Sequence, residues 1–549
     1  PESTRPMTRR AARWTALAGA LALAACAPPA ERAPRGLVLI SIDTLRADHL
    51  GAYGYHRPTS PFFDRLAERG ALFERAIVQL PGTLPSHMSI FTGLYPAEHG
   101  VYPPDSVLSG DIPTLPEVLR AHGLRTAGFT EGGYVDGHYG FARGFERFAA
   151  DAGGDARAIE TTFAHGLDFL SGLAADQRFF LFLHTYVVHD PYDPPPPYPE
   201  LFWQGAPPPD AFPPTGPNLT AVNRGTRSVS PATVRYFEAL YDGSIRYLDD
   251  QLAAFFAGLE GLGLTDETAI VLTSDHGEEF LEHGKLVHQQ IYQETVRVPL
   301  LVIEPGRRTG ARVAALVESV DLAPTLWELA AVPAPPASSG RSLVHLLRRP
   351  ADAHRGEAYS EQFGAPTRGL YRFDDGRLWH QVQARSPAVD GGHWVEREAT
   401  FDVRGGRLDL ALHTYHEART LEVRVDGVRH GFFDLPLDRR IERSLALPPG
   451  FHRVTLVVPT CTSPAVLGLS VDRRCLGFRL LAGDLGWTDL FDVDADPGER
   501  VNLAERHGVV VDALAERLSG LAWRPRAAAG RDALAPELRR RLEALGYLQ

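Results

Sequence analysis

Three long apolar stretches of the chain end in acidic or histidine side chains. They cover residues 37–54, 179–192 and 269–277, and they carry Asp43, His189, and the pair Asp275 and His276. Each is a nearly continuous run of apolar, often β-branched residues, which is typical of strands buried on both faces of an α/β sheet. Because ligands of open α/β sheets bind at the carboxyl ends of the strands, these side chains are candidates for one site.

A different pattern begins near residue 399. Up to about residue 482 apolar and polar positions alternate, as in Leu421, Val423 and Val425, and turn sequences such as Asp426-Gly427 interrupt the alternation. Strands of this kind, with no helical segments between them, predict a β-sandwich-like module. The module either serves as an additional packing domain or binds a glycan or another surface.

Length and charge narrow the classes of function. With 549 residues, of which 44% are apolar, the chain exceeds what one hydrophobic core usually supports, so two or more domains are expected. Acidic residues outnumber basic ones by 68 to 56, and the sequence has no long basic run. Nucleic acid is therefore not an expected partner.

Residues 1–26 have the features of an export signal. Basic residues precede an apolar run too short to span a membrane, and small residues precede Cys26. Residues 23–26 (LAAC) resemble a bacterial lipobox, in which the cysteine is diacylated; the alternative is an ordinary cleaved signal with a chance cysteine. A lipid on Cys26 would hold the protein on a membrane of the bacterial cell envelope, facing the periplasm or the exterior, with residues 27–34 as a tether.

The other two cysteines, Cys461 and Cys475, lie in one segment. An oxidising periplasm would permit a disulfide between them, and two buried free thiols are the alternative.

Residues 80–100 (LPGTLPSHMSIFTGLYPAEHG) resemble the nucleophile signature of sulfatases, Cys/Ser-x-Pro-Ser-Arg followed by Thr-Gly. Residues 282–302, 320–336 and 489–505 resemble later landmarks of that family in the same order. The resemblance implies a sulfatase/alkaline-phosphatase-like α/β fold, a mixed sheet flanked by helices, with a smaller C-terminal subdomain. The catalytic domain would span residues 35–350. Residues 351–398 and 483–549 would form the subdomain, and the β module at 399–482 would be inserted into it.

Thr83 stands where sulfatases carry the Cys or Ser that becomes formylglycine. Threonine is not a substrate for that modification, so no formylglycine is expected, and Thr83 would attack through its own hydroxyl. Such a hydroxyl becomes an effective nucleophile only when a base or a metal lowers its pKa.

Asp43, Asp275 and His276, completed by Thr83, are the expected metal ligands. The sulfatase set has a second Asp where Thr44 stands and an Asn where His276 stands, so this set resembles that of sulfatase-like enzymes acting on phosphate esters. The imidazole moves the preference from calcium toward zinc or manganese, and one ion is favoured over two. The alternative is that Asp43 and Asp275 only cap helix N-termini.

The resemblance also assigns positions to three histidines. His189 matches an active-site histidine that would donate a proton to the leaving oxygen or bind the ester, whereas His288 and His87 stand where sulfatases carry a Lys and an Arg. Each is a candidate catalytic residue, and each alone is equally compatible with a structural role.

The expected function is hydrolysis of phosphate or sulfate esters by Thr83, with phosphate diesters or monoesters favoured. One alternative is a sulfuric ester hydrolase that works without formylglycine; the other is a non-catalytic protein that binds surfaces or glycans. The expected partners are the ester substrate, which includes envelope lipids or glycans, and the membrane.

Overall fold

The computed structural model describes residues 33–151, 157–307, 309–362, 367–374, 376–385, 393–395, 397–414, 417–437, 439, 441–461, 463, 478–480, 486–504, 506–521 and 534–544. Within these residues no helix is both long enough and apolar enough to cross a membrane. The predicted signal, Cys26 and Cys475 lie outside the described residues, whereas Cys461 is disulfide-bonded.

The catalytic part is built on an eight-stranded mixed sheet. Its strands in spatial order are β10 (Ala311–Glu318), β2 (Ala71–Ile77), β9 (Arg297–Ile303), β6 (Thr268–Ser274), β1 (Gly36–Ile42), β5 (Phe179–Thr185), β3 (Arg125–Thr130) and β4 (Arg147–Ala150). The three strands predicted from the apolar stretches are β1, β5 and β6, and β1 lies between the other two, parallel to both. Their carboxyl ends therefore meet at one edge of the sheet.

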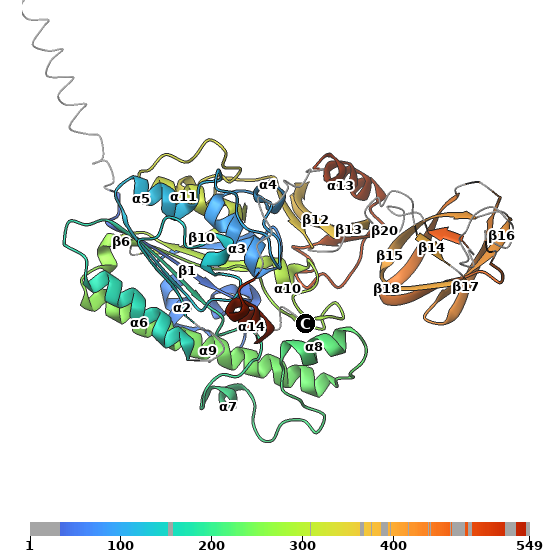
Figure 1. Cartoon of the computed structure of the whole chain (residues 1–549), viewed down its shortest axis with the longest axis horizontal. Helices are drawn as coiled ribbons and strands as arrows, with labels where there is room; N and C mark the ends of the chain where they lie inside the picture. Colours follow the sequence, from blue (N-terminus) through green and yellow to red (C-terminus); the bar gives the residue numbers. More distant parts are fainter. Residues whose placement is uncertain are drawn as a thin grey trace, which may run out of the picture.

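Helices cover both faces of this sheet (Figure 1). On one face, Leu37 and Leu39 of β1 belong to a core shared with α3 (Thr83–Thr92), α5 (Leu115–Ala121) and α11 (Leu322–Leu329). On the other, Val38, Ile40 and Ile42 pack with α2 (Pro61–Ala67), α6 (Ala158–Ser171) and α9 (Pro231–Gly261). Because alternate residues of one strand enter two cores, both sets must be apolar, which explains the continuous apolar runs. The predicted mixed α/β fold is confirmed.

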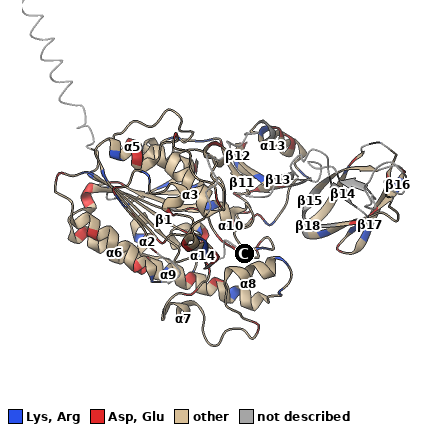
Figure 2. Ribbon diagram, viewed as in Figure 1, with Lys and Arg blue, Asp and Glu red and all other residues tan. Residues whose placement is uncertain are grey.

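Shorter elements connect this framework. They are η1 (Ala47–His49), η2 (Gly51–Tyr53), α4 (Pro96–His99), η3 (Gly137–Tyr139), α7 (Tyr198–Phe202), α8 (Gly216–Asn223), η4 (Thr265–Glu267), the hairpin β7 (Glu279–Phe280) and β8 (Leu286–Val287), α10 (Gln293–Val296), η5 (Ser319–Asp321) and α12 (Val344–Arg348). Charges of both signs are interspersed over the flanking helices (Figure 2).

A second, antiparallel sheet forms the C-terminal region. Its main order is β11 (Glu357–Glu361), β12 (Thr367–Asp374), β13 (Arg377–Arg385), β20 (Gly486–Asp492), β15 (Glu398–Thr414), β18 (Ile441–Val457), β16 (Arg419–Val425) and β17 (Val428–Leu435), and β14 (His393–Val395) and β19 (Phe478–Leu480) pair beside it. Helix α13 (Gly508–Gly520) packs on this sheet, and α14 (Pro536–Ala544) contributes Leu538 and Leu542 to the catalytic core.

The alternating segment forms strands with an apolar core of their own. Leu421 and Val423 of β16 are buried there with Leu408, Leu410 and Val454, and Asp426 and Gly427 make the predicted turn between β16 and β17. These strands continue the subdomain sheet, because β15 pairs with β20. The boundaries of an inserted module at 399–482 stay a prediction.

A buried polar joint ties the subdomain to the catalytic domain. The Glu499 carboxylate accepts a hydrogen bond from the Gln293 backbone amide (2.9 Å) and lies 2.5 Å from His380 Nδ1. The Glu499 backbone oxygen lies 3.1 Å from His283 Nε2. Because buried polar groups are costly unless paired, this joint fixes segment 279–296, which carries His288.

The loop after β6 also touches α10 at backbone level. The Gly277 amide donates to Thr295 O (2.8 Å), and the Glu278 amide donates to Glu294 O (3.0 Å). A Cβ on Gly277 would lie 1.9 Å from Glu294 O, so only glycine permits this approach next to His276.

Gly277→Ala should therefore destabilise the catalytic domain by about 3 kcal/mol, because a methyl group would have to displace backbone rather than a flexible side chain. The measurement is the thermal unfolding midpoint of the purified variant. The control is Gly261→Ala at the end of α9, where a Cβ would meet nothing within 4 Å and stability should hold or rise slightly. Equal midpoints for both variants would contradict the prediction.

Candidate functional site

The carboxyl ends of β1, β5 and β6 form the floor of the candidate site. Asp43 follows β1, Asp275 and His276 follow β6, and the loop after β5 carries His189. Helix α3 begins at Thr83, and Thr83, His189 and His288 line one pocket of about 500 Å³. The structure thus brings together the candidate residues from all three apolar stretches and from the signature segment.

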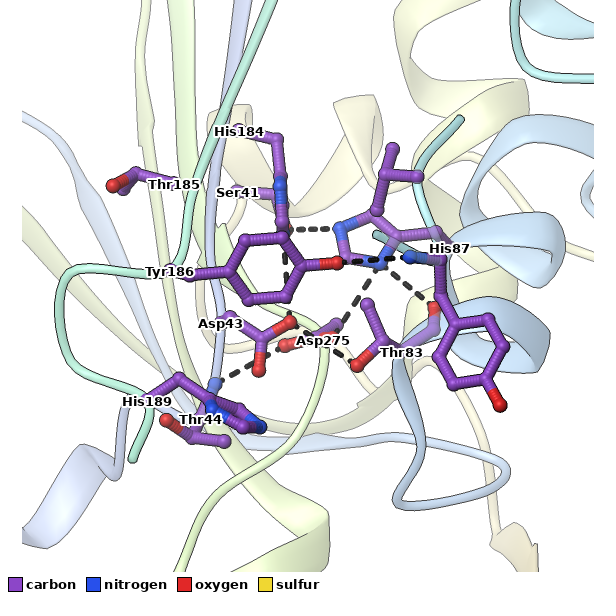
Figure 3. Close-up of polar contacts among 12 residues, drawn as sticks. Ser41, Asp43, Thr44, Thr83, His87, His184, Thr185, Tyr186, His189 and Asp275 are labelled. Atoms are coloured by element: carbon purple, nitrogen blue, oxygen red, sulfur yellow. Dashed lines mark hydrogen bonds and ion pairs between the residues drawn. The ribbon is translucent and has the colours of Figure 1, made fainter. Parts of the chain in front are cut away.

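Thr83 directs its hydroxyl at the Asp43 carboxylate. Its Oγ1 donates a hydrogen bond to Asp43 Oδ2 at 3.1 Å (Figure 3). The same oxygen lies 3.5 Å from His276 Nε2. Gly82 precedes it as the N-cap residue in an extended conformation, so Thr83 is the first helical residue. The positive end of the α3 dipole therefore faces the pocket, where it favours an anion.

Asp43, Asp275 and His276 form a group able to hold a cation. One ligand atom from each lies within 4.8 Å of the others, and all three side chains are fully buried. Asp43 Oδ1 and Asp275 Oδ2 are buried without a hydrogen-bond partner. His276 Nδ1 lies 3.0 Å from Gly277 O, a geometry that places the proton on Nδ1 and directs the Nε2 lone pair at the two carboxylates.

The electrostatics of this group also fit a cation. Burial raises the pKa of Asp43 to about 6, and burial together with the neighbouring Asp43 raises the pKa of Asp275 well above its ordinary value. Burial lowers the pKa of His276 to about 3, so this ring does not supply the missing positive charge. A divalent cation would compensate both carboxylates and use the orphaned oxygen atoms, so the residues present fit the metal that the sequence implies.

His87 lies behind Thr83 rather than in the pocket lining. Its Nδ1 is 2.9 Å from Thr83 O and its Nε2 is 2.9 Å from Ser41 Oγ, so Nδ1–H donates to the carbonyl and Nε2 accepts from the serine. The ring is fully buried, and its pKa is lowered well below the usual value by burial and by the nearby His184. His87 Nδ1 also lies 3.4 Å from Asp275 Oδ2. The structure therefore places His87 beside Thr83 and Asp275, but not where it would contact a substrate in the pocket.

His184 is a site residue that the sequence reasoning missed. It is the penultimate residue of β5 and pairs in register with Ser41 of β1. Its Nε2 lies 3.5 Å from Asp43 Oδ2, and neither ring nitrogen makes a hydrogen bond. A polar residue near the end of an otherwise apolar strand was the available signal, because such a side chain lies at the edge where the site forms.

His189 and His288 line the pocket beside the candidate ligands. His189 Nδ1 lies 2.7 Å from Asp190 O; although burial lowers its pKa, the carboxylates of Asp190, Asp43 and Glu278 outweigh that effect and raise it to about 9. The His288 ring centre lies 4.3 Å from that of His276 and 5.7 Å from that of His189. Burial and His189 lower the pKa of His288 to about 3.

Two buried carboxyl groups near the site also escaped the sequence reasoning. Glu278 Oε1 lies 3.6 Å from His288 Nδ1, and burial raises the pKa of Glu278 to about 8. Glu131 accepts a hydrogen bond from the Tyr186 amide at 2.9 Å, and burial raises its pKa to about 7. Acidic residues are common in any sequence, so only the fold reveals that these two are enclosed.

Comparison with known proteins identifies the family of the chain. The Sulfatase family model matches residues 35–332. Arylsulfatase K of Homo sapiens is 23% identical over 382 residues, which cover 61% of this chain and 71% of that protein. Arylsulfatase of Clostridium perfringens is 25% identical over 374 residues, covering 57% and 78%.

A solved structure has the same fold over almost the whole chain. A putative sulfatase from Bacteroides thetaiotaomicron aligns with a TM-score of 0.59 at 18% identity, covering 92% of this chain and 96% of its own. The family match spans more than half of the chain, and the matched region contains the strands and the helix that build the site. The chain therefore belongs to the sulfatase family, whose members are ester hydrolases of the alkaline phosphatase superfamily.

Proposed function

We propose that this protein is a metal-dependent hydrolase of phosphate esters, with diesters favoured, and that Thr83 is its nucleophile. The observation that carries the proposal is the position of the Thr83 hydroxyl, at the N-terminus of α3 and within hydrogen-bond reach of Asp43 beside two further metal-type ligands. The known family membership restricts the reaction to ester hydrolysis, and the residues of the site supply the rest of the argument.

Asp43, Asp275 and His276 would hold one divalent ion, with Thr83 completing the set. The combination of carboxylate oxygens with an imidazole nitrogen suits zinc or manganese better than calcium. When bound, such an ion lowers the pKa of a hydroxyl ligand and neutralises charge on the ester oxygens.

The protein's own groups then have distinct tasks. Asp43 Oδ2 accepts the hydrogen bond of the Thr83 hydroxyl and orients that oxygen toward the pocket. The N-terminus of α3 stabilises the anionic ester. His189 is protonated near neutral pH because of its carboxylate neighbours, so it can donate a proton to the leaving oxygen. His87 holds the Thr83 carbonyl in place, and His288 lies where it can contact the ester.

The covalent chemistry favours phosphate over sulfate. A formylglycine hydrate can release sulfate by collapsing to the aldehyde, whereas an ester of threonine has no such route. Water must attack phosphorus or sulfur to free Thr83, and phosphoryl transfer is readily catalysed by positioning and charge stabilisation.

A true sulfatase is the second candidate, and the similarity to arylsulfatases favours it. A phosphonate monoester hydrolase of Agrobacterium radiobacter shares the fold with a TM-score of 0.58 at 17% identity, covering 89% of this chain and 95% of its own. At that identity it does not favour either substrate. A purely binding role is the third candidate, but a decayed enzyme would be expected to lose part of the set formed by Asp43, Thr83, Asp275 and His276.

Metal content tests the ligand set. The purified protein should contain about one zinc or manganese ion per chain, and Asp275→Ala or His276→Ala should lose most of it, because only two of the three carboxylate and imidazole ligands then remain beside Thr83. Elemental analysis measures this directly. His122→Ala, an exposed histidine, is the control and should keep its metal. An active enzyme without metal would contradict the proposal.

Matched 4-nitrophenyl esters test the nucleophile and the reaction. The kcat/KM for a phosphate diester or monoester should exceed that for the sulfate, and Thr83→Ala should lose nearly all activity, by a factor on the order of 10⁶, as for a removed serine nucleophile. Thr83→Ser should retain activity, since it keeps the hydroxyl. Intact mass should show no aldehyde at residue 83. A clear preference for the sulfate would make the sulfatase alternative the leading one.

We further propose an envelope location, which rests on the sequence of residues 1–26 alone. Cys26→Ser should shift the protein from the membrane fraction to the soluble fraction, because acyl chains supply the membrane affinity. Fractionation followed by mass spectrometry of the mature N-terminus measures both location and lipid. Soluble wild-type protein that begins at another residue would refute this proposal.

A further inference from the structure

Apolar side chains, four of them prolines, make up about half of the lining of the pocket at Thr83. Its apolar lining residues are Leu80, Pro81, Leu84, Pro85, Pro103, Pro104, Tyr134 and Val287. They come from the segment that leads into α3 and its first turn, from the loop after α4, from the loop after β3 and from β8. Prolines have little freedom to lose on binding, so these walls are already in place before a substrate enters.

Tyr134 is fixed as one of these walls by the loop after β3. Gly132 and Gly133 both have left-handed backbones, with φ of 79° and 62°, which turn the chain back toward the site. The Tyr134 amide then donates to Tyr186 Oη at 3.2 Å, and that hydroxyl donates to Gly132 O at 3.2 Å. The aromatic side chain is 5% exposed and borders the pocket.

The polar part of the lining carries no fixed positive charge. None of the described residues that line the pocket is Lys or Arg. Apart from Thr83, His189 and His288 at the reacting end, the polar lining groups are the Asp190 carboxyl, the Thr220 hydroxyl and the amides of Gln289 and Gln362. Two nearby cations are engaged elsewhere, because Lys285 donates to Asn223 O and Arg46 pairs with Asp48 and Glu282.

From these walls we infer that the organic group of the substrate is uncharged and apolar, an aryl or alkyl group, rather than an anionic sugar. This inference rests on the proposed function, since it assumes that the ester reacts at Thr83. His189 lies at the reacting end, beside the ester, so an additional carboxylate or sulfate along the described walls would lose water without gaining a cationic partner of its own, and it would approach Asp190. An apolar group gains from leaving water, and the neutral amides and hydroxyl can bind an uncharged polar atom next to it.

Two phosphate diesters with one leaving group test the inference on the metal-loaded enzyme. They are 4-nitrophenyl phenyl phosphate and its analogue with a carboxylate at the para position of the phenyl ring. The kcat/KM of the neutral diester should be at least about tenfold higher, because the added charge has no partner. Equal or faster turnover of the charged analogue would overturn the inference while leaving the proposed function intact. A third diester with an octyl group in place of phenyl distinguishes alkyl from aryl preference.

A variant with an added positive charge in the lining tests whether the organic group lies in this pocket. Thr220→Arg on α8 should raise the relative kcat/KM of the charged analogue, whereas Thr226→Arg, an exposed position beyond the end of α8 and outside the lining, should leave the ratio unchanged. An unchanged ratio in both variants would mean that the organic group does not lie against Thr220 and would refute the assigned pocket.

Binding measurements test the preference for an apolar organic group independently of whether the enzyme hydrolyses the ester. In the inactive Thr83→Ala variant, calorimetry with both diesters should show tighter binding of the neutral one. If wild-type enzyme hydrolyses neither diester, the proposed function fails, and the binding preference still decides between an apolar and an anionic group. Tighter or equal binding of the charged diester would overturn the inference.

Discussion

Two carboxylates buried side by side at the carboxyl ends of adjacent parallel strands are the constraint on which the site depends. Asp43 and Asp275 have no exposure to water, each keeps an oxygen atom without a hydrogen bond, and burial raises the pKa of both. Such an arrangement is unfavourable by itself, because the cost of burying both carboxylates exceeds what the nearby His189 returns to Asp43. The rest of the fold has to hold the two carboxylates together. A bound cation would remove their mutual repulsion, and the relief would contribute to the free energy of cation binding.

The sheet order makes this possible. With β1 between β5 and β6, the residues after all three strands are within one side chain's reach, and α3 begins against the same edge. Gly277 lets the chain after His276 run against Glu294, and the joint at Glu499 locks the segment that carries His288. The C-terminal subdomain therefore acts on the site through segment 279–296 as well as through Gln362 in the pocket lining.

Sequence patterns predicted the central strands of the sheet and the polar residues that follow them. The continuous apolar runs gave β1, β5 and β6, because a strand covered on both faces has few polar positions, and the resemblance placed Thr83, Asp43, Asp275 and His276. His184 had one local signal, its polarity near the end of an apolar strand, whereas Glu278 had none. The role of either residue depends on the strand register and on which loops enclose it. The pairing of β15 with β20 was equally hidden, since pairing between strands far apart in the sequence leaves no local signal.

The histidines show how the charge of the site differs from that of the sulfatase pattern. The sequence resemblance puts His87 and His288 where that pattern has an arginine and a lysine, and burial lowers the pKa of both imidazoles. If the resemblance holds at these positions, two permanent cations would be absent, and Thr83 would stand in place of the formylglycine precursor. The charge on a bound ester would then be balanced by a metal, by the α3 N-terminus and by His189, all of which lie at the reacting end of the pocket. An organic group extending along the proline walls meets no comparable charge. The chemistry and the selectivity of this enzyme would thus reside in separate parts of one pocket, so the walls can change without disturbing the group around Asp43.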